Sequence, residues 1–144
     1  MRLGLPALRA RNVRVALARA LSAAGAYTEA IGAYREAARL MPDDPEGWLR
    51  LADALLNLGG DPQGAVEELQ VALRIEPESA RGYGALGAAL HAMGEHPEAA
   101  ASFAEAVRLD PEYLASRPAL REMEASSKLG TAWPPAEQAA DPGS

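Results

Sequence analysis

The sequence predicts an all-α protein, an α-α solenoid of helical hairpins, and three observations support that fold class. Alanine and leucine supply most of the apolar residues, which make up 49% of the chain, whereas aromatic residues account for only 5%. Alanine loses no side-chain entropy in a helix, so this composition favours closely packed helices. The strand-forming residues isoleucine and threonine occur only twice each. Finally, a pattern of small residues recurs every 34 or 35 residues.

The recurring pattern consists of a glycine, two alanines, a branched aliphatic residue and a proline in fixed order. Corresponding positions are separated by 35 and then by 34 residues, and Tyr34, Leu69 and Phe103 keep the same spacing. Such a period is typical of repeat proteins, in which each unit buries its apolar face against the next. The three sets are Gly25, Ala30, Ala37, Leu40 and Pro42, then Gly60, Ala65, Ala72, Ile75 and Pro77, then Gly94, Ala99, Ala106, Leu109 and Pro111.

This pattern resembles the tetratricopeptide repeat (TPR), a 34-residue motif with W-x2-L-G-x2-Y followed by A, F, A and P. The repeats would span residues 11–44, 45–79 and 80–113. Repeat 1 departs most, because Arg14 stands where the motif has tryptophan; this suits a terminal repeat without an upstream neighbour. The third repeat matches best, through Tyr83, Leu86, Gly87, Leu90, Gly94, Ala99, Phe103, Ala106 and Pro111.

The resemblance implies three helical hairpins, with helices near 11–24 and 28–40, 45–58 and 62–74, and 80–92 and 96–108. Small residues fall where the two helices of a hairpin approach, because larger side chains would force the axes apart. Leucines spaced at i, i+4 are expected to fill the seams. The small residues are Ala18, Ala30, Ala37, Ala52, Ala65, Ala72, Gly87, Ala99 and Ala106; the leucines are Leu17, Leu21, Leu51, Leu55, Leu86 and Leu90.

The segments on either side of the repeats differ in character. Residues 1–10 are interpreted as a basic lead-in, and residues 114–128 as a capping helix with an irregular first turn at Pro118. Residues 129–144 are rich in proline and glycine and are expected to be a disordered tail, in which Trp133 is either a docking motif or simply part of the linker. Five arginines precede the first acidic residue, Glu29: Arg2, Arg9, Arg11, Arg14 and Arg19.

In the family that the chain resembles, the first helices line a concave groove that holds a partner's peptide. One arginine per repeat is expected there, and guanidinium groups bind carboxylates through two parallel hydrogen bonds. The alternative is that these arginines pair with Glu46, Asp53 and other neighbours on a solvated face. The expected groove residues are Val15, Arg19, Leu49, Arg50, Asp53, Arg81, Gly84, Ala88 and His91.

TPR co-chaperones clamp a terminal carboxylate with five lysine, asparagine and arginine side chains. Three of those five positions correspond to Arg19, Arg50 and Arg81, but Val15 and Ala85 occupy the other two and cannot hydrogen-bond a carboxylate. The resemblance therefore implies an arginine-lined groove for an acidic or C-terminal peptide rather than the full clamp. The bare wall formed by Gly84, Ala85, Ala88 and Ala89 is expected either to admit an apolar side chain or partner helix, or to be an ordinary helix of small residues.

The sequence gives little support for catalysis or for binding of metal ions, nucleic acids or membranes. Two histidines, His91 and His96, are interpreted as solvated and lack a third metal ligand, and no phosphate loop or nucleophile motif occurs. The net charge of −6 argues against general nucleic-acid binding, and no apolar run is long enough for a membrane span. We therefore expect a non-enzymatic interaction module without cofactor or metal.

The expected partner is another protein that offers an acidic or C-terminal peptide or an amphipathic helix. The competing interpretation is a structural solenoid that self-assembles by stacking into homo-oligomers. The absence of cysteine is compatible with a reducing compartment, so a cytoplasmic location is expected. A periplasmic or organellar location is the alternative if the basic N-terminus is a targeting segment.

Overall fold

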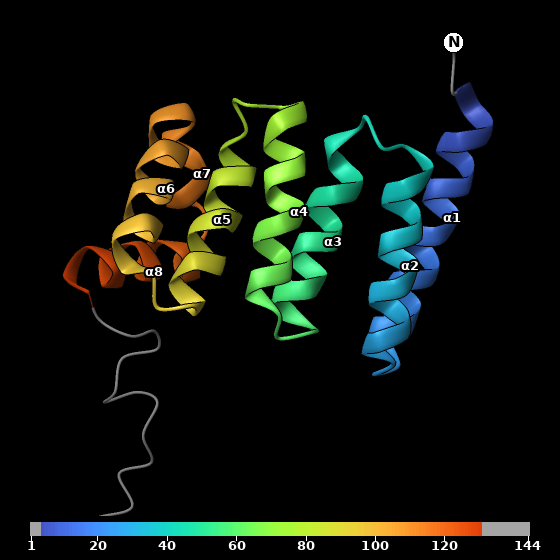
Figure 1. Cartoon of the computed structure of the whole chain (residues 1–144), viewed down its shortest axis with the longest axis horizontal. Coiled ribbons are helices and arrows are strands. Elements are labelled where there is room, and N and C mark those ends of the chain that lie inside the picture. The colour runs from blue at the N-terminus through green and yellow to red at the C-terminus, as the bar shows by residue number, and fades with distance from the viewer. Residues whose placement is uncertain (1–3, 131–144) are drawn as a thin grey trace, which may run out of the picture. The chain divides into compact units, whose positions relative to one another are not determined.

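The computed structural model describes residues 4–130, and every regular element within them is helical, which confirms the all-α prediction (Figure 1). The chain divides into two compact units, Met1–Pro77 and Glu78–Ser144. The N-terminal unit contains α1 (Gly4–Ala23), α2 (Tyr27–Leu40), α3 (Pro45–Asn57) and α4 (Pro62–Ile75). The C-terminal unit contains α5 (Ala80–Ala92), α6 (His96–Leu109), α7 (Pro111–Ala115) and α8 (Pro118–Leu129).

The helix boundaries follow from capping residues in the sequence. The Asp44 carboxylate accepts a hydrogen bond from the Glu46 amide at 2.9 Å, and the Ser79 hydroxyl accepts one from the Gly82 amide at 2.9 Å. These bonds satisfy amides that have no partner within the helix. The turn after α1 ends at Gly25, whose φ of 83° is readily adopted only by glycine.

The first helix is longer than expected. It begins at Gly4, whereas the sequence indicated a start near residue 11. Residues 4–10 contain alanine, leucine and arginine, which favour helix, and Pro6 lies in the first turn, where its missing amide is tolerated. Most of the expected lead-in therefore extends α1 by about two turns.

Small side chains allow the helices to approach closely, as predicted. The eight alanines predicted at helix contacts are each at most 1% exposed, and Gly87 is buried. Where α3 meets α2, a Cβ atom on Gly47 would lie 2.8 Å from the Ala38 Cα. One expected seam residue is wrong: Leu17 is 44% exposed, because within the described residues no helix covers that face of α1.

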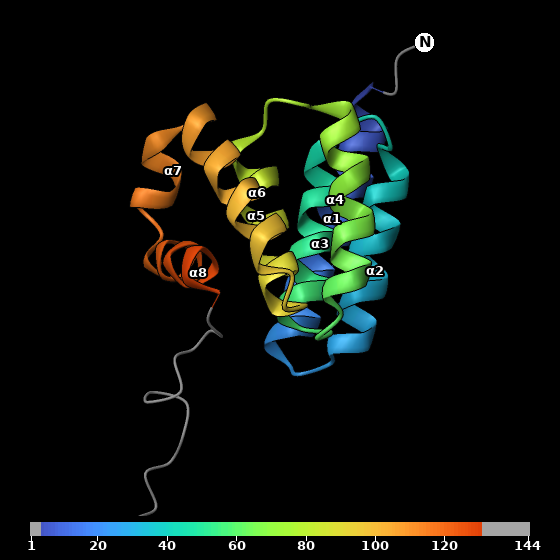
Figure 2. The same cartoon turned by 60° about the vertical axis from the view of Figure 1, so that its left-hand side comes forward.

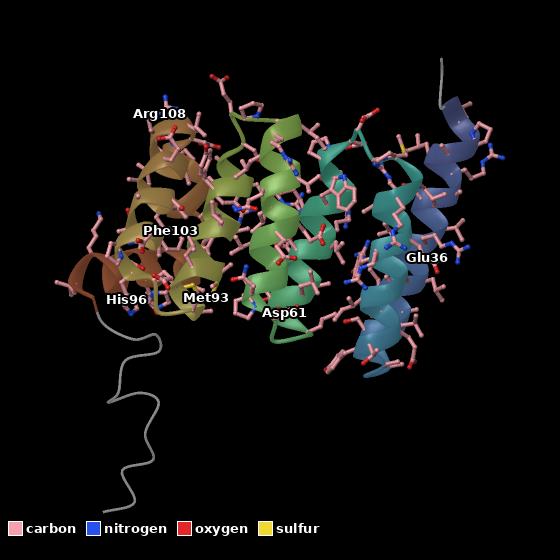
Figure 3. The ribbon with its side chains drawn as sticks, viewed as in Figure 1. Glu36, Asp61, Met93, His96, Phe103 and Arg108 are labelled. Carbon is pink, nitrogen blue, oxygen red and sulfur yellow. The ribbon has the colours of Figure 1, made fainter. Side chains whose placement is uncertain are left out.

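Between α5 and α6, a glycine accommodates an aromatic ring. Phe103 on α6, labelled in Figure 3, is fully buried, and a Cβ atom on Gly87 of α5 would lie 2.8–2.9 Å from three of its ring atoms. These include Cγ, the ring atom nearest the backbone, so the ring cannot simply swing away. The contact therefore requires glycine at position 87.

The expected capping helix is divided in two. α7 ends at Ala115 and α8 starts at Pro118, and Figure 2 shows the two helices running in different directions. A residue before proline is restricted to extended conformations, and Arg117 has φ −127° and ψ 91°. Both pieces pack against α5 and α6. The expected tail, including Trp133, lies outside the described residues apart from Leu129, which ends α8, and Gly130.

We predict that Gly87→Ala lowers the free energy of unfolding of the C-terminal unit by about 1–3 kcal/mol, because the new methyl group overlaps the buried Phe103 ring. Gly32→Ala in α2 is a matched control, since its Cβ atom would meet nothing within 4 Å. That change is expected to raise stability by about 0.5–1 kcal/mol. Urea unfolding followed by circular dichroism measures both; equal effects of the two substitutions would contradict the predicted packing.

Candidate functional site

A hollow of about 220 Å³ lies between α1 and α3 of the N-terminal unit. It brings together three of the predicted groove residues, Val15, Arg19 and Arg50. Small and apolar side chains alternate with charged ones around it, so it offers both space and charge to a ligand. Its full lining is Arg11, Asn12, Val15, Ala16, Arg19, Glu46 and Arg50.

Helical periodicity explains why these residues share one hollow. Arg11, Val15 and Arg19 are separated by four residues each and therefore lie along one face of α1. Glu46 and Arg50 lie in the same way along one face of α3. Arg11 was not among the predicted groove residues, although its i, i+4 relation to Val15 was a signal that could have identified it.

Arg11 is held in place by the N-cap of α3. Its guanidinium lies 2.6 Å from the Asp44 carboxylate, and its side chain is only 12% exposed. Partial burial acts to raise the pKa of Asp44, but hydrogen bonds from the Glu46 amide and Arg11 outweigh it, so the pKa lies below its ordinary value. The pair joins α1 to α3 across the hollow and neutralises the charge of Arg11.

The remaining two arginines of the hollow differ in pairing. Arg50 lies 2.9 Å from Glu46, one turn earlier on α3. This agrees with the alternative interpretation, in which the arginines pair with neighbouring carboxylates. Arg19 is exposed and forms no ion pair within residues 4–130. The hollow therefore carries three arginines against two paired carboxylates, and the uncompensated positive charge belongs to Arg19.

The other predicted groove residues lie elsewhere. Leu49 is buried in α3, and Asp53, one turn further along that helix, is half-buried and engaged in an interaction; neither lines the hollow. Arg81, Gly84, Ala88 and His91 belong to α5 in the C-terminal unit. Arg81 is half-buried and also has an interaction partner, whereas Ala88 is only 6% exposed.

The wall around Gly84 is not bare. A Cβ atom on Gly84 would lie 2.8 Å from the Tyr113 ring of α7 and 3.7 Å from Leu120 of α8. The bulky apolar group expected from a partner is thus supplied by the chain's own cap. The sequence could not reveal this, because the contact depends on how α7 and α8 pack on α5.

His91 lies beneath the cap as well, and the interpretation of this histidine as solvated is wrong. It is 6% exposed, its Nδ1 is 2.9 Å from the Ser127 hydroxyl of α8, and its ring centroid lies 5.0 Å from that of His96. Within residues 4–130, its Nε2 has no hydrogen-bond partner. Burial lowers the pKa of His91, and His96 lowers it further. Figure 3 labels His96 at the turn that follows α5.

Neither a metal centre nor a membrane span is found in the part of the chain that the structure describes. Residues 4–130 contain no group of three or more histidine, aspartate or glutamate side chains placed to hold a metal ion. No helix in the same range is both long and apolar enough to cross a bilayer.

Comparison with known families decides the assignment. The sequence model of the tetratricopeptide repeat matches residues 15–80 and 59–113, which together cover more than half of the chain. The chain belongs to the tetratricopeptide repeat family. Among curated proteins, none matches the chain.

Solved TPR structures share the fold. The TPR domain of Arabidopsis OM64 is 23% identical, with 85% of this chain and 98% of that one covered and a TM-score of 0.73. The first TPR of Spaghetti (RPAP3) bound to the HSP90 peptide SRMEEVD is 21% identical, with coverages of 82% and 93% and a TM-score of 0.70. The Yersinia enterocolitica type III secretion chaperone SycD, in complex with a YopD peptide, is 20% identical, with coverages of 82% and 92% and a TM-score of 0.70.

We predict that the C-terminal unit of this TPR protein loses stability as the pH falls from 7.5 to 5.5. The unfolded chain binds a proton at His91 near the ordinary pKa of about 6.5, whereas the folded unit binds it only at lower pH. Between these pH values the unfolded state binds more protons than the folded state does. The free energy of unfolding therefore falls on acidification. Urea titrations followed by circular dichroism at each pH measure the slope.

His91→Gln should flatten this slope, since it removes the buried titrating group. The chain has two histidines and no cysteine, so His96→Gln is the natural control and should retain most of the slope. An unchanged slope in His91→Gln would contradict the assignment to His91.

Proposed function

We propose that this TPR protein binds an acidic segment of a partner protein in the hollow between α1 and α3, with a partner carboxylate on Arg19. The observation that supports this most directly is the difference in pairing: Arg11 and Arg50 are matched by Asp44 and Glu46, whereas Arg19 is exposed and unpaired in the described chain. An unpaired guanidinium beside an apolar surface is well suited to a carboxylate, which it binds with charge-assisted hydrogen bonds.

The neighbouring groups define the orientation of such a ligand. Val15 and Ala16 form an apolar floor next to Arg19 and can accept an aliphatic side chain. Glu46 lies on the opposite wall and repels a second carboxylate there, so the acidic group is expected on the α1 side. Specificity then comes from one placed positive charge, one placed negative charge and the small floor between them.

The TPR proteins of similar structure support the ligand class. One was solved with an HSP90 peptide whose sequence, SRMEEVD, carries two glutamates and ends in aspartate, and another with a peptide of the translocator YopD. In this chain Val15 stands at a clamp position and provides no hydrogen bond. We therefore propose recognition of acidic character rather than the complete grip on a terminal carboxylate.

The role we propose is that of a non-enzymatic adaptor or scaffold. The residues that line the hollow include no pair of side chains arranged as nucleophile and base; Arg11 and Arg50 are engaged with carboxylates, and Arg19 is the unpaired charge. A co-chaperone-like role and a cytoplasmic location remain predictions from the sequence.

We predict that Arg19→Glu weakens binding of the fluorescently labelled peptide SRMEEVD by about ten- to a hundredfold, since one charge-assisted hydrogen-bonding site is replaced by a repulsive one. Fluorescence anisotropy at low salt measures the affinity, and added salt should weaken binding to the wild type. A peptide with lysines in place of the two glutamates should bind poorly.

The matched control is Arg74→Glu, which makes the same charge change at an exposed site on α4. Its affinity should stay close to that of the wild type. Equal affinities of the wild type and Arg19→Glu for the acidic peptide, or no binding by either, would overturn the proposed function.

A further inference from the structure

The outward face of α1 is apolar, and no helix within residues 4–130 covers it. Leu5 is 69% exposed, Val13 62% and Leu17 44%. Ala16 and Ala20 lie between them and are also exposed. Two shallow hollows, of about 510 and 380 Å³, flank Leu5, Arg9 and Val13. In Figure 1, α1 forms the edge of the N-terminal unit.

The repeat itself explains what this face is built for. The first helices of repeats 1 and 2 are 34 residues apart, because the extra residue that makes later positions 35 apart lies at Gly59–Gly60. Val13 therefore corresponds to Gly47, Leu17 to Leu51 and Ala20 to Ala54. Those three residues of α3 are all buried, and Gly47 lies directly against Ala38 of α2. The exposed face of α1 is therefore the equivalent of the face by which α3 packs on a preceding second helix.

Charge indicates which kind of helix fits there. α1 contains four arginines and no acidic residue. Arg11 is neutralised by Asp44, and Arg14 lies 2.9 Å from Glu36 of α2. Arg9, between the two hollows, is exposed and has no ion pair within residues 4–130. A partner helix must therefore supply a carboxylate at this point.

A second copy of α1 does not meet this requirement. Because α1 has no aspartate or glutamate, any pairing of two α1 helices would bring arginines together without a compensating charge. We propose that the outward face of α1, formed by Leu5, Arg9, Val13, Ala16, Leu17 and Ala20, docks an amphipathic helix of a partner protein. That helix carries small and apolar residues along one stripe and an acidic residue opposite Arg9.

This surface adjoins the hollow that contains Arg19 and shares Ala16 with it, but Arg9, Val13 and Leu17 do not line that hollow, so substitutions at these residues test the surface separately. The probes are two stapled helical peptides of the length of α2, 14 residues, with the same alanine and leucine stripe. One is flanked by glutamates and the other by lysines. The wild type should bind the glutamate peptide more tightly than the lysine peptide in a fluorescence anisotropy titration.

Two substitutions on α1 should change this result in different ways. Val13→Glu should lower the affinity for the glutamate peptide by at least about tenfold, because it places a carboxylate in the apolar contact. Arg9→Glu should reverse the preference, so that the lysine peptide binds better. The exposed controls Gln70→Glu and Arg74→Glu on α4 make the same charge changes and should leave both affinities unchanged.

A cross-test separates this inference from the proposed function. Arg19→Glu should still bind the glutamate-flanked helix, and Val13→Glu should still bind SRMEEVD. The inference is overturned if the two helical peptides bind the wild type equally, or if Val13→Glu leaves their affinities unchanged. It is also overturned if light scattering finds a concentration-dependent dimer that Val13→Glu abolishes, since the occupant would then be a second copy.

Discussion

Close approach between helices, made possible by side chains of minimal size, is the constraint on which both units depend. α3 reaches α2 because Gly47 places no atom where it would overlap the Ala38 backbone. α5 and α6 hold Phe103 between them because Gly87 leaves room for the ring. Because the interior is densely packed, a methyl group added at either glycine would overlap neighbouring atoms that have no room to move. Both positions therefore require glycine.

The same constraint creates the candidate site. α2 packs against both α1 and α3, and α1 and α3 leave a hollow between them. The Arg11–Asp44 pair spans this gap and also fixes the start of α3, because Asp44 caps that helix. A single acidic residue thus contacts both walls, of which α1 carries Arg19 and α3 carries Arg50.

The spacing of small residues was enough to predict the hairpins, the buried alanines and the helical class. Each repeat packs in the same way and therefore needs small residues at the same positions. The sequence pattern could not predict features that occur in only one repeat. Leu17 matches Leu51 in the pattern, yet among the helices of residues 4–130 only Leu51 is covered by a preceding one. His91 was expected in solvent because its burial depends on α8, whose direction is set by the bend before Pro118. Of the groove residues expected from the sequence, Val15, Arg19 and Arg50 line one hollow, because helical periodicity places residues of α1 and of α3 on shared faces, whereas the contacts of the cap with Gly84 and His91 have no counterpart in the earlier repeats.

The distribution of charge on α1 connects the basic start of the chain with its acidic remainder. Two of its four arginines, Arg11 and Arg14, are neutralised by Asp44 and Glu36 and hold the helix on the unit. The other two, Arg9 and Arg19, are exposed and have no ionic partner in the described chain; Arg9 lines the two outward hollows and Arg19 the hollow between α1 and α3. In a protein with a net charge of −6, two unpaired cations on one helix preserve a local attraction for acidic partners. Because a helix is rigid over this length, a ligand held by Arg9 does not need to rearrange the backbone that presents Arg19.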